Sequence, residues 1–238
     1  MLLRLESVSK RYGAMKVVDA VSLCVAQGET LGILGPNGAG KTTLFNLISG
    51  DARVDSGSVS FAGEEITRLA PHRRCRLGIG RSYQIPQPFS AMTVFENLLV
   101  AASFGGALRG HDAHALCVET LELSGLLSRA NRLAGTLTLL DRKRLELARA
   151  LATRPRLLLL DEIAGGLTEH EARELVEEIR SIKARGVTML WIEHVVHALL
   201  AVADRLFVLN HGQRLAEGAP QDVLADTAVK RVYMGIEA

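Results

Sequence analysis

A glycine-rich stretch followed by a lysine and two threonines is the part of this sequence best suited to chemistry. Residues 35–42 match the spacing G-x-x-x-x-G-K-[ST]. The glycines let backbone N–H groups curve around a β-phosphate, and the helix that follows directs its positive end at the same anion. Lys41 is predicted to reach the β- and γ-phosphates, and the Thr42 hydroxyl is a predicted Mg²⁺ ligand. The predicted nucleotide-binding residues of this loop are Gly35, Pro36, Asn37, Gly38, Ala39, Gly40, Lys41, Thr42 and Thr43.

A second element of the same chemistry follows four consecutive leucines, residues 157–160. A buried strand of this kind brings Asp161 to its carboxyl end, where the side chain is suited to the Mg²⁺ water shell. Glu162 comes next and is placed to polarise an attacking water. Ordinary strand-end acids are the alternative, and the phosphate loop in the same chain makes that alternative weaker. The guanine-reading motif Asn-Lys-x-Asp is absent from the sequence, which argues against a GTPase.

Composition sets limits on the class of protein. The chain has 238 residues, enough for one sizeable domain or a core with a satellite subdomain. Hydrophobic residues make up 48% and aromatic residues only 4%, so the core must be mostly aliphatic. The net charge of +2, with 23% charged residues, fits a soluble globular protein and argues against a strongly basic nucleic-acid binder, although it allows a local basic patch.

Cysteine spacing and hydropathy indicate the cellular compartment of the chain. Cys24, Cys75 and Cys117 are far apart, which favours reduced thiols over a zinc site or a redox dithiol. No apolar run reaches the roughly 18 residues of a membrane span. The charged N-terminus is unlike a secretion signal. We therefore expect a cytosolic chain that associates with a membrane only through a partner.

The elements that must position these residues follow from the hydrophobic pattern. Alternation predicts strands over 2–8 and 17–25, and short apolar runs predict buried strands over 30–34, 157–160, 187–192 and 205–209. Helical spacing is expected over 41–49, ending at Gly50, and from Thr168 to near Gly186, with a hairpin around residues 62–63. The region from 89 to about 152 is mainly helical in pattern. Together these predict a parallel, helix-covered sheet with a helical insertion in mid-chain.

Over nearly its whole length the sequence resembles the ABC ATPase family. The resemblance rests on the phosphate loop, on Lys-Arg-Tyr-Gly at 10–13, on Arg-Ser-Tyr-Gln at 81–84, and on Ile-Glu-His at 192–194. It implies an α/β fold of the P-loop NTPase class, with a RecA-like parallel core, an antiparallel β subdomain and an inserted helical subdomain. On this basis the core is expected over about 1–86 and 153–238, and the helical subdomain over about 87–152, in a single nucleotide-binding domain.

The family pattern also assigns roles by position. Tyr12 would stack on adenine, and Gln84 of the Q-loop would reach Mg²⁺ and the attacking water. Gly166, Leu167 and Thr168 would form the D-loop that crosses to an opposite subunit. His194 would contact the γ-phosphate. The implied catalytic residues are Glu162, His194 and Gln84, the implied metal ligands are Thr42, Gln84 and Asp161, and the cofactors are ATP and Mg²⁺.

Several stretches resemble the cassettes of branched-chain amino-acid importers in particular. They include Pro-His-Arg at 71–73, Thr-Val-Phe-Glu-Asn-Leu at 93–98 and the terminal Val-Tyr-Met-Gly at 232–235. Related importers for urea, other amides or other amino acids share much of this pattern, so uptake of a related small polar solute stays open. The resemblance implies two permease subunits, a second cassette, identical or different, and a periplasmic solute-binding protein that acts indirectly. The chain would then lie peripherally on the cytoplasmic face of the inner membrane. An apolar stripe of Ile85, Pro86, Phe89, Met92 and Phe95 would either dock the permease or pack the helical core.

The sequence departs from the family at its signature motif. Where the family has Leu-Ser-Gly-Gly-Gln, this chain has Leu137, Thr138, Leu139, Leu140 and Asp141. Leu140 replaces a glycine that permits close backbone approach to a partner's γ-phosphate. Asp141 is expected to cap a helix over 142–151 and to repel a triphosphate. We therefore predict an asymmetric dimer whose composite site built on this signature is weak, although Thr138 and the backbone could suffice for normal function.

Other functional interpretations remain open at this stage. An exporter cassette, including those that extract lipid or lipopolysaccharide, would have a similar sequence. A soluble ABC protein acting on DNA or ribosomes would carry two cassettes or a long coiled coil, and this chain has neither. A non-catalytic regulatory cassette would fit the altered signature, but Gln84, Asp161, Glu162 and His194 are all present.

Overall fold

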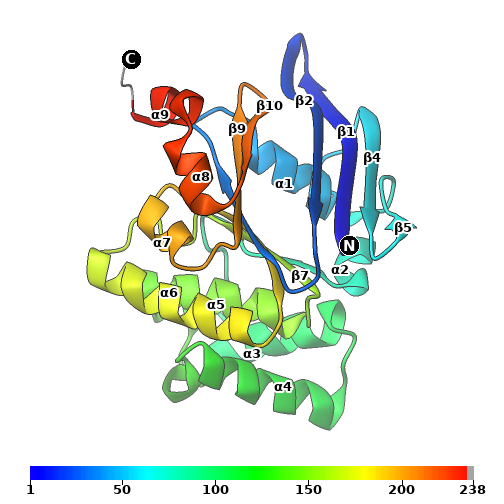
Figure 1. Cartoon of the computed structure of the whole chain (residues 1–238). Helices are drawn as coiled ribbons and strands as arrows, with labels where there is room; N and C mark the ends of the chain where they lie inside the picture. Colours follow the sequence, from blue (N-terminus) through cyan, green and yellow to red (C-terminus); the bar gives the residue numbers. More distant parts are fainter. Residues whose placement is uncertain (235–238) are drawn as a thin grey trace. The chain divides into compact units, whose positions relative to one another are not determined.

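The computed structural model describes residues 1–234, apart from the side chain of Met234. Figure 1 shows the helices and strands of the chain, which divides into two compact units. The first comprises Met1–Pro71 and the chain from Thr188 onward, and the second comprises His72–Val187. Each unit is described separately below.

The first unit contains a four-stranded antiparallel sheet in the order β2-β1-β4-β5. β1 (Leu3–Tyr12) pairs with β2 (Met15–Val25) on one side and with β4 (Ser56–Phe61) on the other. The short β5 (Glu64–Glu65) completes the predicted hairpin, in which Ala62 and Gly63 both have positive φ. Alternating residues of β1 are buried, including Leu3, Leu5 and Val8, because one face of this sheet covers the core.

A second set of strands in this unit has a parallel centre. β3 (Thr30–Leu34) lies between β8 (Thr188–Ile192) and β9 (Arg205–Asn210) and is parallel to both. All five residues of β3 and of β8 are buried, as expected for strands covered on both faces. β10 (Gln213–Gly218) adds an antiparallel edge beside β9.

Helices complete the first unit. α1 (Lys41–Ser49) follows β3 directly and lies between the two sheets in Figure 1, with Leu44, Phe45, Leu47 and Ile48 fully buried. It ends at Gly50, whose left-handed backbone forms the predicted C-cap. The chain finishes with α7 (Val196–Leu200), α8 (Pro220–Ala225) and α9 (Thr227–Met234). Of the terminal motif at 232–235, Gly235 lies outside the described residues.

The second unit begins with α2 (Pro71–Leu77), which starts at the boundary, and contains two parallel strands. β6 (Ile79–Arg81) pairs with β7 (Leu157–Asp161) through the register Arg81 to Leu159. All five residues of β7 are buried. β6 ends at Arg81 and β7 ends at Asp161. Because the two strands are parallel, these two charged residues lie at the same edge of the sheet.

Helices make up most of the second unit. α3 (Val94–Val100) begins with a capping box between Thr93 and Glu96 and continues into a π-helical turn over Ala101–Gly105. α3, α4 (Gly110–Leu123) and α5 (Leu139–Ala152) share an aliphatic core that includes Leu98, Leu121 and Leu145. Two 3-10 turns, Leu127–Arg129 and Ala134–Thr136, connect α4 to α5. α6 (Glu169–Ala184) begins at Thr168 with the predicted capping box to Glu171.

Most sequence-based elements match these bounds, and the signature helix is the main correction. Its start is Leu139 rather than Arg142, because Thr138 is the N-cap and accepts a hydrogen bond from the Asp141 N–H. Asp141 is therefore in the first turn and is not the cap. The predicted helical subdomain over 87–152 lies inside the second unit, and its boundaries stay a prediction.

Candidate active site

The phosphate loop of the first unit is preformed around its lysine. Lys41 is buried, and its Nζ donates hydrogen bonds to the backbone carbonyls of Gly35, at 2.7 Å, and Pro36, at 3.0 Å. The loop therefore already surrounds the cation that the motif assigns to the phosphates. Thr42 is exposed at the start of α1, where its hydroxyl is accessible to a ligand. The N-terminus of α1 adds a partial positive charge at the same end.

Two positions of this loop require glycine, because the backbone of a neighbouring strand lies where a Cβ would be. A Cβ built on Gly35 would lie 2.2 Å from the carbonyl oxygen of Leu209. At Gly40, where φ is 101°, it would lie 2.4 Å from the carbonyl oxygen of Val17. Strands β2 and β9 thus hold the loop so tightly that a side chain has no room. Sequence reasoning assigned these glycines to phosphate binding, and the structure adds a packing reason.

Tyr12 and His194 are the two other predicted site residues in the first unit. Tyr12 lies at the end of β1 with its ring half exposed, and Lys10 Nζ is 5.4 Å from the ring centroid. His194 is exposed in the turn after β8. The buried carboxylate of Glu193 holds this turn by accepting hydrogen bonds from the backbone N–H groups of His194, at 2.9 Å, and Val195, at 3.3 Å. Glu193 thus fixes the backbone that carries His194.

Asp161 has a buried counter-ion in the second unit. Arg81 Nη2 lies 3.1 Å from Asp161 Oδ2, at the adjacent ends of β6 and β7. The same guanidinium lies over the ring of Tyr83, with its central carbon 4.7 Å from the centroid. The sequence indicates Arg81 only as part of the Q-loop pattern. Its ion pair with the predicted metal ligand could not be read from residue types.

The structure brings Gln84 and Glu162 into direct contact. Gln84 Nε2 donates a hydrogen bond of 2.5 Å to Glu162 Oε2. Glu162 has a left-handed backbone, with φ 47°, which is strained for a residue that has a Cβ. The predicted general base, Glu162, and the predicted water-positioning amide, Gln84, therefore lie within hydrogen-bond distance of each other. Glu162 also follows Asp161 directly in the chain.

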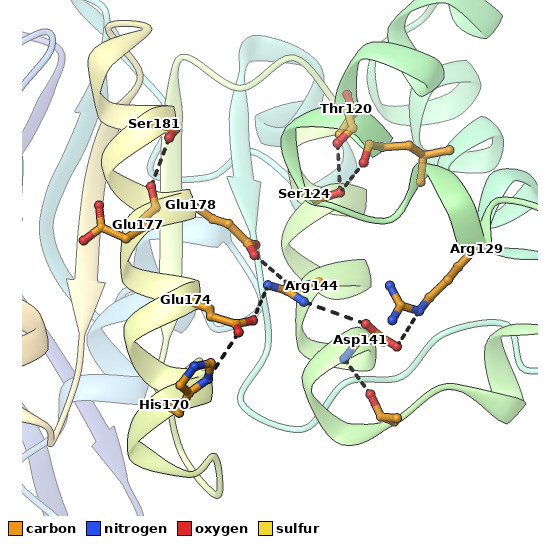
Figure 2. A network of polar contacts seen from close by, with 12 residues as sticks. Thr120, Ser124, Arg129, Asp141, Arg144, His170, Glu174, Glu177, Glu178 and Ser181 are labelled. Atoms are coloured by element: carbon orange, nitrogen blue, oxygen red, sulfur yellow. Dashed lines mark hydrogen bonds and ion pairs between the residues drawn. The ribbon is translucent and has the colours of Figure 1, made fainter.

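The signature segment shows that Asp141 does not project freely toward a ligand. Its side chain is only 4% exposed, and Arg129 Nε lies 3.0 Å from its Oδ2 (Figure 2). Arg144 Nη1 is 4.0 Å from the other carboxylate oxygen. The predicted repulsion of a triphosphate by Asp141 is therefore weakened, since two guanidinium groups compensate its charge. Leu140 is also buried, at 9% exposure, whereas Leu139 is exposed.

Arg144 connects this segment to α6. Its guanidinium donates hydrogen bonds to Glu178, at 2.6 Å, and to Glu174, at 2.9 Å, and His170 lies 3.2 Å from Glu174 (Figure 2). Burial raises the pKa of Glu178 to about 7, against the lowering effect of Arg144. A charge network thus joins the signature helix to the helix that follows the D-loop.

The D-loop residues precede α6 directly. Gly166 has φ 79°, and Thr168 accepts a hydrogen bond of 3.3 Å from the Glu171 N–H. The Glu171 carboxylate accepts in return from the Thr168 N–H, at 2.8 Å. Thr168 thus caps α6, and its predicted contact with an opposite subunit stays a prediction.

Cys24, Cys75 and Cys117 are free cysteines in the structure. Burial raises the pKa of the Cys117 thiol to about 11, so this thiol is inert near neutrality. In residues 1–234 no group of three or more His, Cys, Asp or Glu side chains is arranged to hold a metal ion.

A glycine-rich loop with a buried lysine, a strand-end Asp-Glu pair and a glutamine in contact with that glutamate together define an enzyme that binds and hydrolyses nucleoside triphosphates. The family model for ABC transporters matches residues 18–165. The chain belongs to the ABC transporter family, as an ATP-binding subunit with ATPase activity.

Curated relatives are similar over almost the full length. The chain is 36% identical to the high-affinity branched-chain amino acid transport ATP-binding protein LivG of Salmonella typhimurium, over 98% of each chain. It is also 36% identical to BraF of Pseudomonas aeruginosa, a protein of the same description, over 98% of each chain. The lipopolysaccharide export protein LptB of Haemophilus influenzae is 36% identical over 98% of this chain and 97% of its own.

Solved structures confirm the predicted fold class. A nucleotide-free ATP-binding cassette from an ABC transporter superposes with a TM-score of 0.89 at 33% identity, covering 100% of this chain and 99% of that one. The ADP conformation of an ATP-binding cassette of an ABC transporter also gives a TM-score of 0.89, at 34% identity and 99% coverage of both chains. Within the described part of the chain, no helix is long and apolar enough to cross a membrane.

Proposed function

We propose that this chain energises the uptake of amino acids, branched-chain amino acids first among them, through a separate permease. The observation that carries the proposal is the full-length similarity to importer cassettes such as LivG and BraF. The chain's own residues supply what such a subunit needs: a phosphate loop, a general base and a Q-loop glutamine.

The roles of the site residues follow from their motifs and local geometry. Tyr12 stacks on adenine, the loop from Gly35 to Thr43 binds the phosphates, and Lys41 compensates their charge. Glu162 polarises the attacking water, Gln84 orients it, and His194 contacts the γ-phosphate. The half-exposed Tyr12 ring, the buried Lys41 and the contact of Gln84 with Glu162 support these assignments.

Magnesium fits the chemistry of the available oxygen ligands. The hydroxyl of Thr42, the carboxylate of Asp161 and the amide oxygen of Gln84 are hard ligands of the kind that Mg²⁺ prefers. Mg²⁺, when bound, would neutralise charge that develops on the phosphates. The ion pair with Arg81 orients the Asp161 carboxylate at the strand end, which suits a metal ligand.

We also propose a peripheral position on the cytoplasmic face of the membrane, beneath two permease subunits and beside a second cassette. A periplasmic solute-binding protein would deliver the solute. In the predicted docking stripe Ile85 is 70% exposed and Phe89 is 47% exposed, which supports a docking role for these two. Phe95 packs against the helical core instead, so core packing accounts for that part of the stripe.

Recovery of partners from native membranes tests this proposal. The tagged chain would be purified from detergent-solubilised membranes, and the retained proteins identified by mass. We expect two permease subunits and a second cassette, with a solute-binding protein that can then be screened against amino acids. A Lys41→Ala chain should assemble equally well but lose ATP binding. Recovery of soluble partners alone would disprove the transport assignment.

Export is the second candidate, and one observation favours it. The LptB protein of Haemophilus influenzae is as similar to this chain as LivG is, at 36% identity. An exporter of lipid or lipopolysaccharide would be recovered without a solute-binding protein. Its ATPase would respond to lipid in the reconstituted complex and not to an amino-acid-loaded binding protein.

A further inference from the structure

One face of α5 holds the Q-loop through three charged side chains spaced three residues apart, Lys143, Glu146 and Arg149. Lys143 Nζ donates a hydrogen bond of 2.9 Å to the carbonyl of Gln84. Arg149 Nη1 donates one of 3.0 Å to the carbonyl of Gln87. We call these three side chains the α5 clamp.

Glu146 provides the complementary contacts. Its carboxylate accepts hydrogen bonds from the backbone N–H groups of Tyr83 and Gln87. Arg149 Nη1 also lies 2.9 Å from Glu146 Oε2, and its guanidinium carbon lies 5.3 Å from the centre of the Phe89 ring. The clamp thus binds the Q-loop backbone at Tyr83, Gln84 and Gln87. Arg149 also contacts the ring of Phe89.

Two of the three charged side chains of the α5 clamp are buried and therefore depend on their Q-loop partners. Lys143 is 4% exposed and Glu146 is 6% exposed. Buried charges require compensating partners, and much of the compensation here comes from Q-loop backbone groups. Movement of the Q-loop away from α5 would leave both charges in a poor environment. The Q-loop backbone and the signature helix are therefore expected to move together.

Lys143 extends this connection to the general base. Its Nζ also lies 3.3 Å from the carbonyl oxygen of Glu162. Glu162 has the strained backbone described above, and its carboxylate accepts from the Gln84 side chain. One buried cation therefore contacts the backbone of both residues whose side chains meet. It lies four residues after Leu139, at the end of α5 that carries the signature segment.

We propose that Lys143 is a positioning residue for ATP hydrolysis, which with Glu146 and Arg149 transmits displacement of the signature segment to Gln84 and Glu162. The inference rests on the proposed roles of Gln84 and Glu162. Lys143 does not touch ATP in this scheme. It acts by setting where the base and the water-orienting amide lie when the signature helix meets nucleotide on an opposite subunit.

Comparison of Lys143→Met with Lys143→Arg in the assembled transporter tests the role of the cation. Misplacement of a catalytic group by about 1 Å costs on the order of 10²-fold in rate, so kcat of Lys143→Met should fall by about that factor. The Kd for ATP and the KM should stay within about two-fold of the wild-type values, because Lys143 is not part of the phosphate loop and does not contact ATP in this proposal. Lys143→Arg keeps a buried cation and should recover most of the lost kcat.

Matched variants separate this effect from a general loss of structure. Arg142→Met removes a cation from the neighbouring, exposed position and should leave kcat unchanged. If Lys143→Met does not assemble, Lys143→Gln replaces it, since glutamine keeps a donor but loses the charge and the reach. Glu146→Gln keeps the size of the side chain but weakens its hold on Tyr83 and Gln87. It should lower kcat, with little change in ATP affinity.

The outcomes distinguish this inference from the proposed function. Loss of kcat in Lys143→Met and recovery in Lys143→Arg, at constant ATP affinity, support the clamp. Wild-type kcat in Lys143→Met, together with loss of turnover in Glu162→Gln, overturns the clamp and leaves the site assignment intact. Wild-type turnover in Glu162→Gln overturns the assignment of the base and the inference with it.

Discussion

The guanidinium of Arg81 and the carboxylate of Asp161 form a buried ion pair of 3.1 Å at the ends of two parallel strands. Asp161 is the predicted metal ligand, so its counter-ion has a role in the site as well as in the fold. Both side chains are at most 6% exposed, which makes the loss of one partner costly.

Arg81→Met is expected to destabilise the protein by about 3–5 kcal/mol, because it removes a cation from a buried carboxylate. The free energy of unfolding in urea measures this. Asp161→Asn in the same background should recover part of the loss, since the uncompensated charge is then absent. A change below about 0.5 kcal/mol for Arg81→Met would show that other contacts of Asp161 suffice.

Gly40→Ala should be more destabilising than Gly38→Ala. Both glycines have positive φ, which costs a residue with a Cβ about 1–2 kcal/mol. At Gly40 the new Cβ would also lie 2.4 Å from the Val17 carbonyl oxygen, whereas no atom lies within 4 Å of the corresponding point at Gly38. Thermal unfolding of the two variants gives the comparison, and equal midpoints would contradict the packing argument.

The pH dependence of stability should contain a contribution from Glu178. Burial raises the pKa of this carboxyl from its ordinary value of 4.5 to about 7, so the folded protein holds its proton more tightly than the unfolded chain. The contribution of Glu178 to stability is therefore fully present below about pH 4.5 and is lost as pH rises through 7.

Glu178→Gln provides the check on this titration. Between pH 5 and pH 8 the wild type should lose stability relative to this variant, as measured by urea unfolding at several pH values. Glu177→Gln is a suitable control, because Glu177 is on the same helix but exposed. Parallel stability curves for wild type and Glu178→Gln would contradict the raised pKa.

The altered signature predicts unequal composite sites in the transporter. The site that uses Glu162 should account for most turnover, because the opposite site meets Leu140 in place of a glycine. Glu162→Gln should therefore abolish most ATPase activity, whereas the matching change in the second cassette should have little effect. The reverse result would show that the variant signature supports the productive site.

Two substitutions that restore family residues in the signature separate the effect of the Leu140 side chain from the effect of the Asp141 charge. In the Glu162→Gln background, Leu140→Gly should raise the residual turnover, since the backbone can then approach a phosphate more closely. Asp141→Gln alone should give no increase, because the Asp141 carboxylate is already paired with Arg129 and Arg144. An increase with Asp141→Gln would indicate that its charge still acts on the nucleotide.

The sequence predicted the phosphate-binding part of the fold well. Strand Thr30–Leu34 and helix Lys41–Ser49 have the expected bounds, because glycines mark both ends of the loop and the end of the helix. The capping box at Thr168 and Glu171 was equally local and equally readable. Such features depend on residues a few positions apart, which periodicity and capping rules describe.

The features that could not be predicted depend on distant or backbone partners. The counter-ion of Asp141 is Arg129, which reaches it across the turns between α4 and α5. The α5 clamp contacts backbone groups of the Q-loop, and a backbone contact leaves no residue type as a signal. Moreover, Thr138 is the N-cap of α5, a role that its place in the signature motif does not indicate.

The left-handed backbone of Glu162 places activity and stability in opposition at one residue. A side chain in this conformation costs roughly 1–2 kcal/mol, which a glycine would not incur. A chain that abandoned catalysis could therefore gain robustness by a single substitution to glycine. Engineering for heat resistance should therefore leave position 162 unchanged wherever turnover is to be kept.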